Sequence, residues 1–96
     1  MIVRPEAEAD LRQARAWYER QRSGLGTEFI LCVEEVLERI DRNPEGYAVV
    51  YEGLRRAMTR RFPYAVYFRI AEGEVVIVGV FHMRRHPQKW QQRSKL

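Results

Sequence analysis

Two stretches in the first half of the chain carry an apolar residue at every third or fourth position. This spacing gathers the apolar side chains on one side of a helix, and it predicts amphipathic helices over residues 6–22 and 25–42. Because only Ser23-Gly24 separates them, we expect the two helices to form an antiparallel hairpin. The apolar positions are Ala7, Leu11, Ala14 and Tyr18, followed by Leu25, Phe29, Cys32, Val33, Val36, Leu37 and Ile40.

After Gly46 the pattern changes to the alternation that is typical of strands. Three runs are expected to pair as an antiparallel meander, and the last of them is apolar enough to be a central strand. Gly79 inside that run indicates a bend or a close contact. The runs cover residues 56–62, 64–70 and 75–83, with a hairpin turn at 71–74.

Three shorter segments complete the expected fold. Ile2-Val3 predicts a first strand, residues 47–50 are a weaker candidate for an extended segment, and Pro87 begins a tail with one or two helical turns. The order is β-α-α-β-β-β in an α+β domain over residues 1–96. We expect the helices to cover one face of the sheet and to leave the other face open.

The chain has 96 residues and a single cysteine, Cys32. A lone cysteine excludes an internal disulfide framework and a cysteine-based zinc site. Cys32 lies in an apolar helical stretch, so we expect it to be an inert core residue. The sequence holds no apolar segment of signal or membrane-spanning length, and together these features predict a soluble protein of the reducing cytoplasm. No cofactor and no metal ion are expected.

The net charge of +4 conceals two opposed halves. Residues 1–52 carry seven arginines and eleven acids, whereas residues 53–96 carry eight arginines and two lysines against two acids. Arginine offers a planar, always-charged fork that suits carboxylates and phosphates. The imbalance predicts an acidic or polyanionic partner, although arginines that merely solubilise a small sheet explain the same composition.

Local motifs in the second half resemble the RelE/ParE superfamily, the toxins of type II toxin–antitoxin modules. One is the step Arg61-Phe62-Pro63-Tyr64, and another is the ending His82-x-Arg84-Arg85-x-Pro87-x-x-Trp90. Both look most like the ParE branch. The resemblance covers almost the whole chain and implies a growth-inhibiting toxin that forms a hetero-oligomer with its cognate antitoxin, expected here to be an acidic amphipathic segment.

The branch of the superfamily decides the target. ParE-type members act on DNA gyrase, whereas RelE-type members cleave messenger RNA in the ribosome. RNA cleavage needs a base, cations for the phosphate and an acid, and a nuclease here would have to use His82, Arg61 and Arg84. Because residues 53–80 hold no lysine and only two acids, both in a turn, we favour the gyrase poison, which is not an enzyme.

The residues expected to contact the target are mostly cationic, and several have a structural alternative. His82 can bond to neighbouring backbone, one of Arg60 and Arg61 can bridge to the acids of the helical hairpin, and Trp90 can be a packing anchor. A basic nucleic-acid-binding domain without catalysis is a further alternative. The candidate target-binding residues are Arg56, Arg60, Arg61, His82, Arg84, Arg85 and Trp90.

Overall fold

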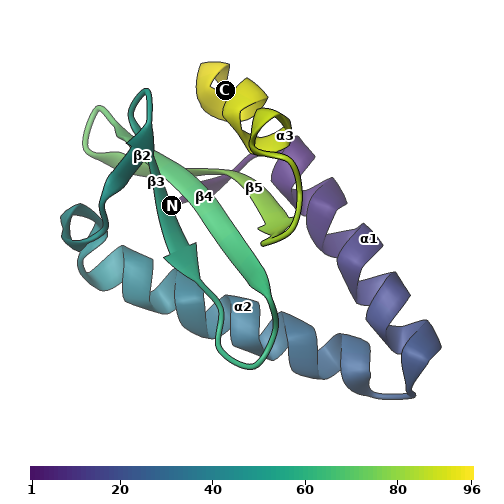
Figure 1. Ribbon diagram of the computed structural model, residues 1–96. Coiled ribbons are helices and arrows are strands. Elements are labelled where there is room, and N and C mark those ends of the chain that lie inside the picture. Colours follow the sequence, from purple (N-terminus) through teal and green to yellow (C-terminus); the bar gives the residue numbers. More distant parts are fainter.

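The computed structural model describes all 96 residues as an α+β fold, shown in Figure 1. The helices and strands follow the expected order. The weaker candidate segment forms a strand before the meander, and the tail forms two short helical segments. The elements are β1 (Ile2–Val3), α1 (Pro5–Gln21), α2 (Leu25–Arg42), a 3₁₀ turn η1 (Pro44–Gly46), β2 (Val49–Tyr51), β3 (Leu54–Met58), β4 (Tyr64–Ala71), β5 (Glu74–His82), α3 (Pro87–Gln91) and a 3₁₀ turn η2 (Gln92–Lys95).

The five strands form one mixed sheet in the order β1-β5-β4-β3-β2. β1 lies parallel to β5, and the other pairs are antiparallel, so the expected meander and first strand are confirmed. The weakly expected extended segment is an edge strand that pairs with β3. Glu72 and Gly73 have φ of 52° and 76°, the left-handed backbone that a two-residue hairpin turn between β4 and β5 requires.

The two long helices begin and end close to the expected positions. A carboxylate joins them, because Glu19 accepts hydrogen bonds from the backbone N–H groups of Gly24 and Gly26, each at 2.9 Å. Gly26 also lies where the helices touch, since a Cβ there would stand 2.8 Å from the carbonyl oxygen of Arg15. The short link therefore fixes the hairpin through a glycine contact and a carboxylate that satisfies free helix N–H groups.

The main core lies between the helical hairpin and one face of the sheet. It contains Phe29, Val33, Val36 and Ile40 of α2, each almost fully buried, packed against alternate residues of the strands. Cys32 is half-buried at the margin of this core rather than inside it, which corrects the expected core position. Leu31 is 59% exposed, because it stands two residues from Phe29 and from Val33 and so lies on the side of α2 that faces away from the core.

β5 contains a bulge at the predicted irregular position. Its register with β4 passes from Ile77 opposite Phe68 to Gly79 opposite Tyr67, so that Val78 is an extra residue. A Cβ on Gly79 would lie 2.5 Å from the Phe81 ring, which confirms a close contact that only glycine allows here.

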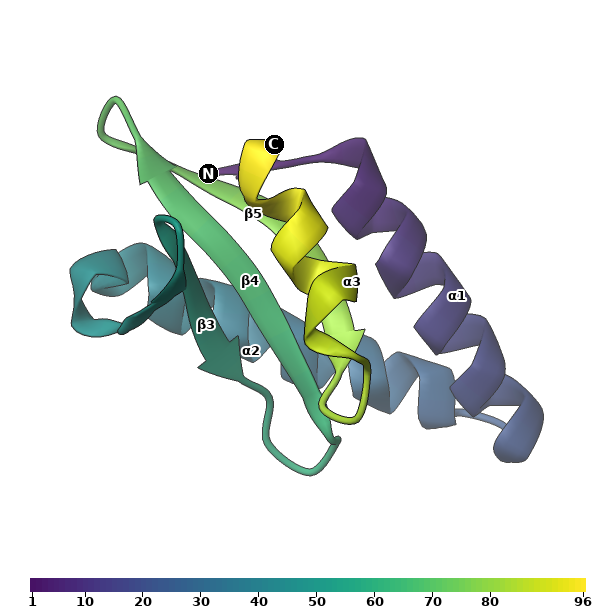
Figure 2. The same cartoon turned by 45° about the horizontal axis from the view of Figure 1, so that its top comes forward.

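The second face of the sheet is not open, which corrects our expectation. Figure 2 shows α3 lying over β4 and β5 on the face opposite α2. Trp90 stacks on Tyr67 with the ring centroids 4.7 Å apart, and a second cluster of buried residues lies beneath it. The tail covers this face because the alternate strand positions that point toward it are also apolar, a feature that two-sided burial requires.

The tail is also held by polar contacts at its end. Arg93 forms an ion pair with Asp10 of α1 at 3.0 Å and donates a hydrogen bond to the carbonyl oxygen of Val78. Asp10 in turn accepts the backbone N–H of Val80, beyond the point where β1 stops pairing with β5.

No helix of the chain has the length and apolar character that crossing a membrane requires.

Candidate functional site

Two arginine pairs lie at one end of the sheet. Arg60 and Arg61 stand in the turn between β3 and β4, and Arg84 and Arg85 follow β5. The two turns touch, since the backbone N–H of Met83 donates to the carbonyl oxygen of Pro63 at 2.8 Å. Five of the seven residues predicted from the sequence, His82 included, are therefore gathered at this end. Arg56 and Trp90 lie on the sheet face instead.

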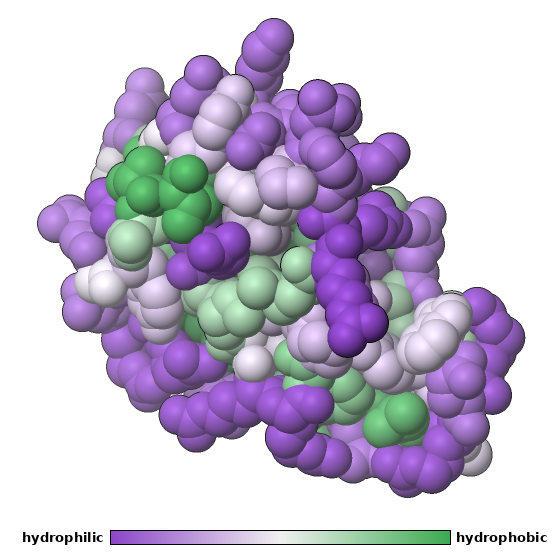
Figure 3. Space-filling model, viewed as in Figure 1, coloured by the Kyte–Doolittle hydropathy of each residue, from purple (hydrophilic) through white to green (hydrophobic).

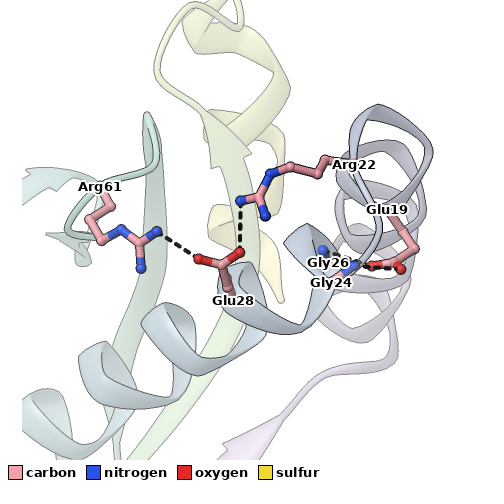
Figure 4. Close-up of polar contacts among 6 residues, drawn as sticks. All are labelled: Glu19, Arg22, Gly24, Gly26, Glu28 and Arg61. Atoms are coloured by element: carbon pink, nitrogen blue, oxygen red, sulfur yellow. Dashed lines mark hydrogen bonds and ion pairs between the residues drawn. The ribbon is translucent and has the colours of Figure 1, made fainter.

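The first arginine pair is bound to the acids of α2. Arg61 donates to Glu28 at 2.8 Å, and Arg60 lies 3.3 Å from Glu35. Glu28 also accepts from Arg22 at the hairpin link, so one carboxylate joins the link, α2 and the β3–β4 turn, as Figure 4 shows. We expected one of the two arginines to bridge to the hairpin, and both do.

The contacts around Glu28 shift the pKa values of the groups that they join. Hydrogen bonds from Arg61 and then Arg22 lower the pKa of the Glu28 carboxyl, and Glu28 in return raises the pKa of Arg61. The pKa of Glu19 is lowered too, mainly by the backbone N–H groups of Gly24 and Gly26. Both carboxylates stay ionised at neutral pH, and Glu28 then pairs with Arg61 of the β3–β4 turn.

The second arginine pair has no such neighbours. Arg84 and Arg85 are exposed and form no ion pair with any acid of the chain. The guanidinium of Arg85 stands over the Phe81 ring, 5.9 Å from its centroid, at a distance typical of a cation–π contact. This end of β5 consequently presents unneutralised positive charge.

His82 and His86 organise the backbone of the second turn. The Nδ1 atom of His82 accepts the backbone N–H of Arg84 at 3.0 Å, and that of His86 accepts the N–H of Gln88 at 3.2 Å. An accepting Nδ1 assigns the proton of each neutral ring to Nε2. With Nδ1 engaged in this way, His82 offers a donor at Nε2.

Trp90 and Arg56 share the sheet face that the tail covers. Trp90 is 8% exposed, with Tyr67 on one side and Tyr51 edge-on at 6.2 Å. Arg56 is half-buried beside Tyr67, whose pKa is raised by burial and moderated by that guanidinium. A tyrosine that keeps its proton, a buried tryptophan and an arginine supply no group that takes a proton at neutral pH.

A groove separates α1 from the end of β5 and the tail, with a volume of about 630 Å³. His82 and Arg85 line it, as predicted site residues, but α1 contributes two residues that sequence reasoning missed, Trp17 and Arg20. Trp17 is 51% exposed although it belongs to a helix that packs on the core. A large aromatic side chain next to the apolar stripe was the signal that could have identified it.

No group of three or more histidine, cysteine, aspartate or glutamate side chains has a geometry suited to a metal ion. The surface seen in Figure 3 is largely hydrophilic, with apolar residues in separate patches. The candidate site therefore consists of cationic and aromatic side chains beside the end of β5.

Comparison with known proteins agrees with this architecture. The family model described as ParE toxin of type II toxin-antitoxin system, parDE, matches residues 1–87. A solved structure from P. aeruginosa, of its chromosomal ParDE toxin–antitoxin system, superposes with a TM-score of 0.75 and 18% identity. The match covers 85% of this chain and 95% of that one. Among curated proteins, no sequence matches. By the family model, which matches more than half of its residues, the chain belongs to the ParE toxin family of type II toxin–antitoxin systems.

Proposed function

We propose that this chain inhibits bacterial growth by acting on DNA gyrase in the cytoplasm, and that a cognate antitoxin holds it silent. The proposal extends the family assignment with the chemistry of the chain itself. Its alternative is cleavage of messenger RNA on the ribosome, which demands a base and an acid that a gyrase poison does not need.

The observation that carries the proposal is the occupied second face of the sheet. Trp90 and the rest of the tail cover the strands where proton-transfer groups would have to meet RNA, and the groups under the tail are tyrosine, arginine and apolar side chains. A phosphodiester cannot contact Tyr67 or the strand residues beneath the tail while Trp90 is stacked on Tyr67. This arrangement favours a target that is bound by the surface of the protein over a substrate cleaved within it.

The state of His82 supports the same reading. Its Nδ1 atom is already engaged by the backbone N–H of Arg84, so the ring would have to break that bond before it could accept a proton from a 2′-hydroxyl. Glutamine can preserve an acceptor for the turn but cannot transfer a proton. His82→Gln therefore separates the two mechanisms.

Growth assays on the intact chain test the proposal. Wild-type and His82→Gln proteins are expressed under tight control, and the DNA damage response and translation are followed separately. We expect early DNA damage with translation intact, and retained growth inhibition in His82→Gln. A nuclease would lose about 10²–10⁴-fold of its activity in that variant. Immediate translation arrest with cut transcripts would overturn the proposal.

The antitoxin is proposed to be an acidic, amphipathic segment that lies along the helical hairpin. Leu31 is the most exposed large apolar residue, and it lies on the helix that carries the main core. An apolar side chain left in water at such a position gains free energy when a partner covers it. Short outer strands, β1 and β2, also leave two sheet edges to which an extended segment can be added.

Affinity for the product of the adjacent reading frame tests the antitoxin proposal. We expect tight binding that Leu31→Glu weakens by at least about tenfold, since a carboxylate would have to be buried against the partner. Glu34→Gln, at an exposed position of the same helix with no ion pair, is the matched control and should bind normally. Absence of binding by any adjacent product would contradict the proposal.

A further inference from the structure

The groove between α1 and the tail has two ends. The end near Trp17 and His82 carries hydrogen-bond donors and no acidic side chain. Figure 2 shows α1 and α3 on either side of it, with the end of β5 between them. Glu6 and Asp10 line the other end, and Asp10 is already paired with Arg93. The two ends of the groove therefore differ in charge.

Aromatic contacts define the donor end. Trp17 meets Tyr18 edge-on at 5.1 Å, Tyr18 meets Tyr64 at 5.9 Å, and Tyr64 meets His82 at 5.3 Å between ring centroids. Trp17 stands at the end of this chain of rings, lines the groove and has half of its surface exposed. A fixed, exposed indole is a stacking surface.

The polar groups around these rings all donate hydrogen bonds. Burial raises the pKa of Tyr64, so its hydroxyl keeps its proton, and His82 presents Nε2–H because Nδ1 accepts from the backbone. Arg85 lies near enough to Tyr64 to lower the pKa of that hydroxyl in opposition to burial. Three cations face this end without an acidic partner in the chain, namely Arg20, Arg85 and Lys89.

We propose that this end of the groove binds a nucleoside phosphate, either free or as part of a single nucleic-acid strand. Arg20, Arg85 and Lys89 hold the phosphate, and a base stacks on Trp17. Cations joined to an exposed aromatic ring are the two elements by which proteins bind single strands without reading their sequence. The proposal does not depend on gyrase being the target, because it is tested by nucleotide binding in solution, although Arg85 is also a candidate target-binding residue.

The choice of a nucleotide over an acidic peptide follows from the ring. A peptide of carboxylates alone would satisfy the three cations, but it has no flat surface to stack on the exposed Trp17 indole. A nucleotide offers an anion and a flat aromatic surface a few ångströms apart, which matches cations and an indole that line one groove.

Binding of fluorescein-labelled (dT)₁₀ to the full chain tests the proposal by anisotropy. Stacking of a base on Trp17 should also quench tryptophan fluorescence. We expect Trp17→Leu to weaken binding about tenfold, as removal of one base–aromatic stack does, and to abolish this quenching. Trp90 is buried against Tyr67, so it leaves the quenching signal to Trp17. Arg20→Glu with Arg85→Glu should weaken binding at least about tenfold and make it less dependent on salt.

Arg12→Glu is the matched control for the single reversal Arg20→Glu, because Arg12 lies exposed on the same helix outside the groove and undergoes the same change of charge. It should alter affinity less than about threefold. Thymidine monophosphate and a ten-residue polyglutamate serve as competitors. Displacement by the monophosphate identifies a free nucleotide as sufficient, whereas binding of (dT)₁₀ alone identifies a strand.

Three results would overturn the proposal. They are the absence of (dT)₁₀ binding, an equal loss of affinity in Arg12→Glu, and binding of polyglutamate as tight as that of (dT)₁₀ and unaffected by Trp17→Leu. Each variant is first checked by its thermal melt, and Trp17→Phe restores an aromatic ring if the leucine variant fails to fold. Because gyrase poisoning is read from DNA damage in cells, failure of either proposal leaves the other distinguishable.

Discussion

The β3–β4 turn and the turn after β5 carry the same dipeptide, Arg-Arg, at neighbouring places in the fold. In the first turn, Glu28 and Glu35 of α2 pair with both arginines. In the second, no acid lies within reach of either arginine. The same local sequence therefore gives a neutralised turn in one place and a cationic surface in the other.

The difference teaches that charge composition alone does not locate a binding surface. Arg61 has a φ of 70°, an uncommon conformation for a residue with a side chain, and its guanidinium is directed to Glu28. Arg85 lies over Phe81 with its charge free of any carboxylate. A partner's acids or phosphates meet Arg61 with its charge already balanced by Glu28, but they meet Arg85 with no acid beside it.

The largest effect should come from removing the aromatic anchor of the first turn. Phe62 is buried among the rings of Tyr18 and Phe29, with centroids 4.9 and 5.4 Å away. Phe62→Ala should lower the free energy of unfolding by about 4 kcal/mol, within the range for losing a buried aromatic side chain. Chemical denaturation measures this, with the exposed Met58→Ala as control. A loss below about 1 kcal/mol would mean that the ion pairs hold the turn.

Charge reversal separates the two arginine pairs in function. Arg84→Glu with Arg85→Glu should weaken growth inhibition about 100-fold, as loss of contacts worth roughly 3 kcal/mol in total would. Arg60→Glu with Arg61→Glu should chiefly lower stability, because it sets acids against Glu35 and Glu28. Dilution plating of induced cells, with melts for each variant, measures both. Equal loss of growth inhibition from the two pairs would remove the functional distinction between the turns.

Substitution of Cys32 on α2 should have a smaller effect on stability. Cys32 is half-buried and lies near enough to Arg61 to act on its pKa. Cys32→Ala should lower the free energy of unfolding by about 1 kcal/mol, less than for a fully buried side chain, and should leave growth inhibition unchanged. A folded Cys32→Ala protein that no longer inhibits growth would show that the thiol contributes to function.

The smallest effect should be the pH dependence of the first turn. The folded-state pKa of Glu28 lies below 4.5 because Arg61 and Arg22 stabilise the carboxylate. Its contribution to stability is therefore present above about pH 4.5 and is lost as the pH falls through the folded-state pKa. Exposed ion pairs contribute little, so the effect is small.

Urea midpoints at pH 7 and pH 3 measure this contribution. We expect Glu28→Gln to be slightly less stable than wild type at pH 7 and to lose less stability on acidification. Glu34→Gln, an exposed acid without an ion pair, should follow wild type. If Glu28→Gln lost as much stability on acidification as wild type, the ion pairs would not be what stabilises the turn.

Most elements of the fold could be predicted from periodicity. The apolar spacing of Phe29, Val33 and Ile40 fixes α2, and alternation fixes the meander, because each pattern produces an apolar face only in its own secondary structure. The tail was harder to predict. A five-residue helix has too few positions for a periodic pattern, and Trp90 finds its place only through Tyr67 on β4.

Some residues of the candidate site could likewise be predicted from the sequence, and others could not. His82, Arg84 and Arg85 were expected from their place after a central strand. Arg20 was missed, because a charged residue on the exposed side of an amphipathic helix has no local mark of the groove it will line. Trp17 was missed although a large aromatic residue beside the apolar stripe was a signal for it. That groove exists only because α1 and the tail lie on either side of the end of β5.

The sequence by itself determined the helical hairpin, the meander and the excess of cations in the second half. These depend on the chemistry of residues near one another in the chain. Only the tertiary structure decided which arginines are neutralised, which face of the sheet is covered and which side chains share a groove. Ion pairing, burial and stacking act over a few ångströms, and packing alone brings Glu28 to Arg61, Trp90 to Tyr67 and Trp17 to the groove that Arg85 lines.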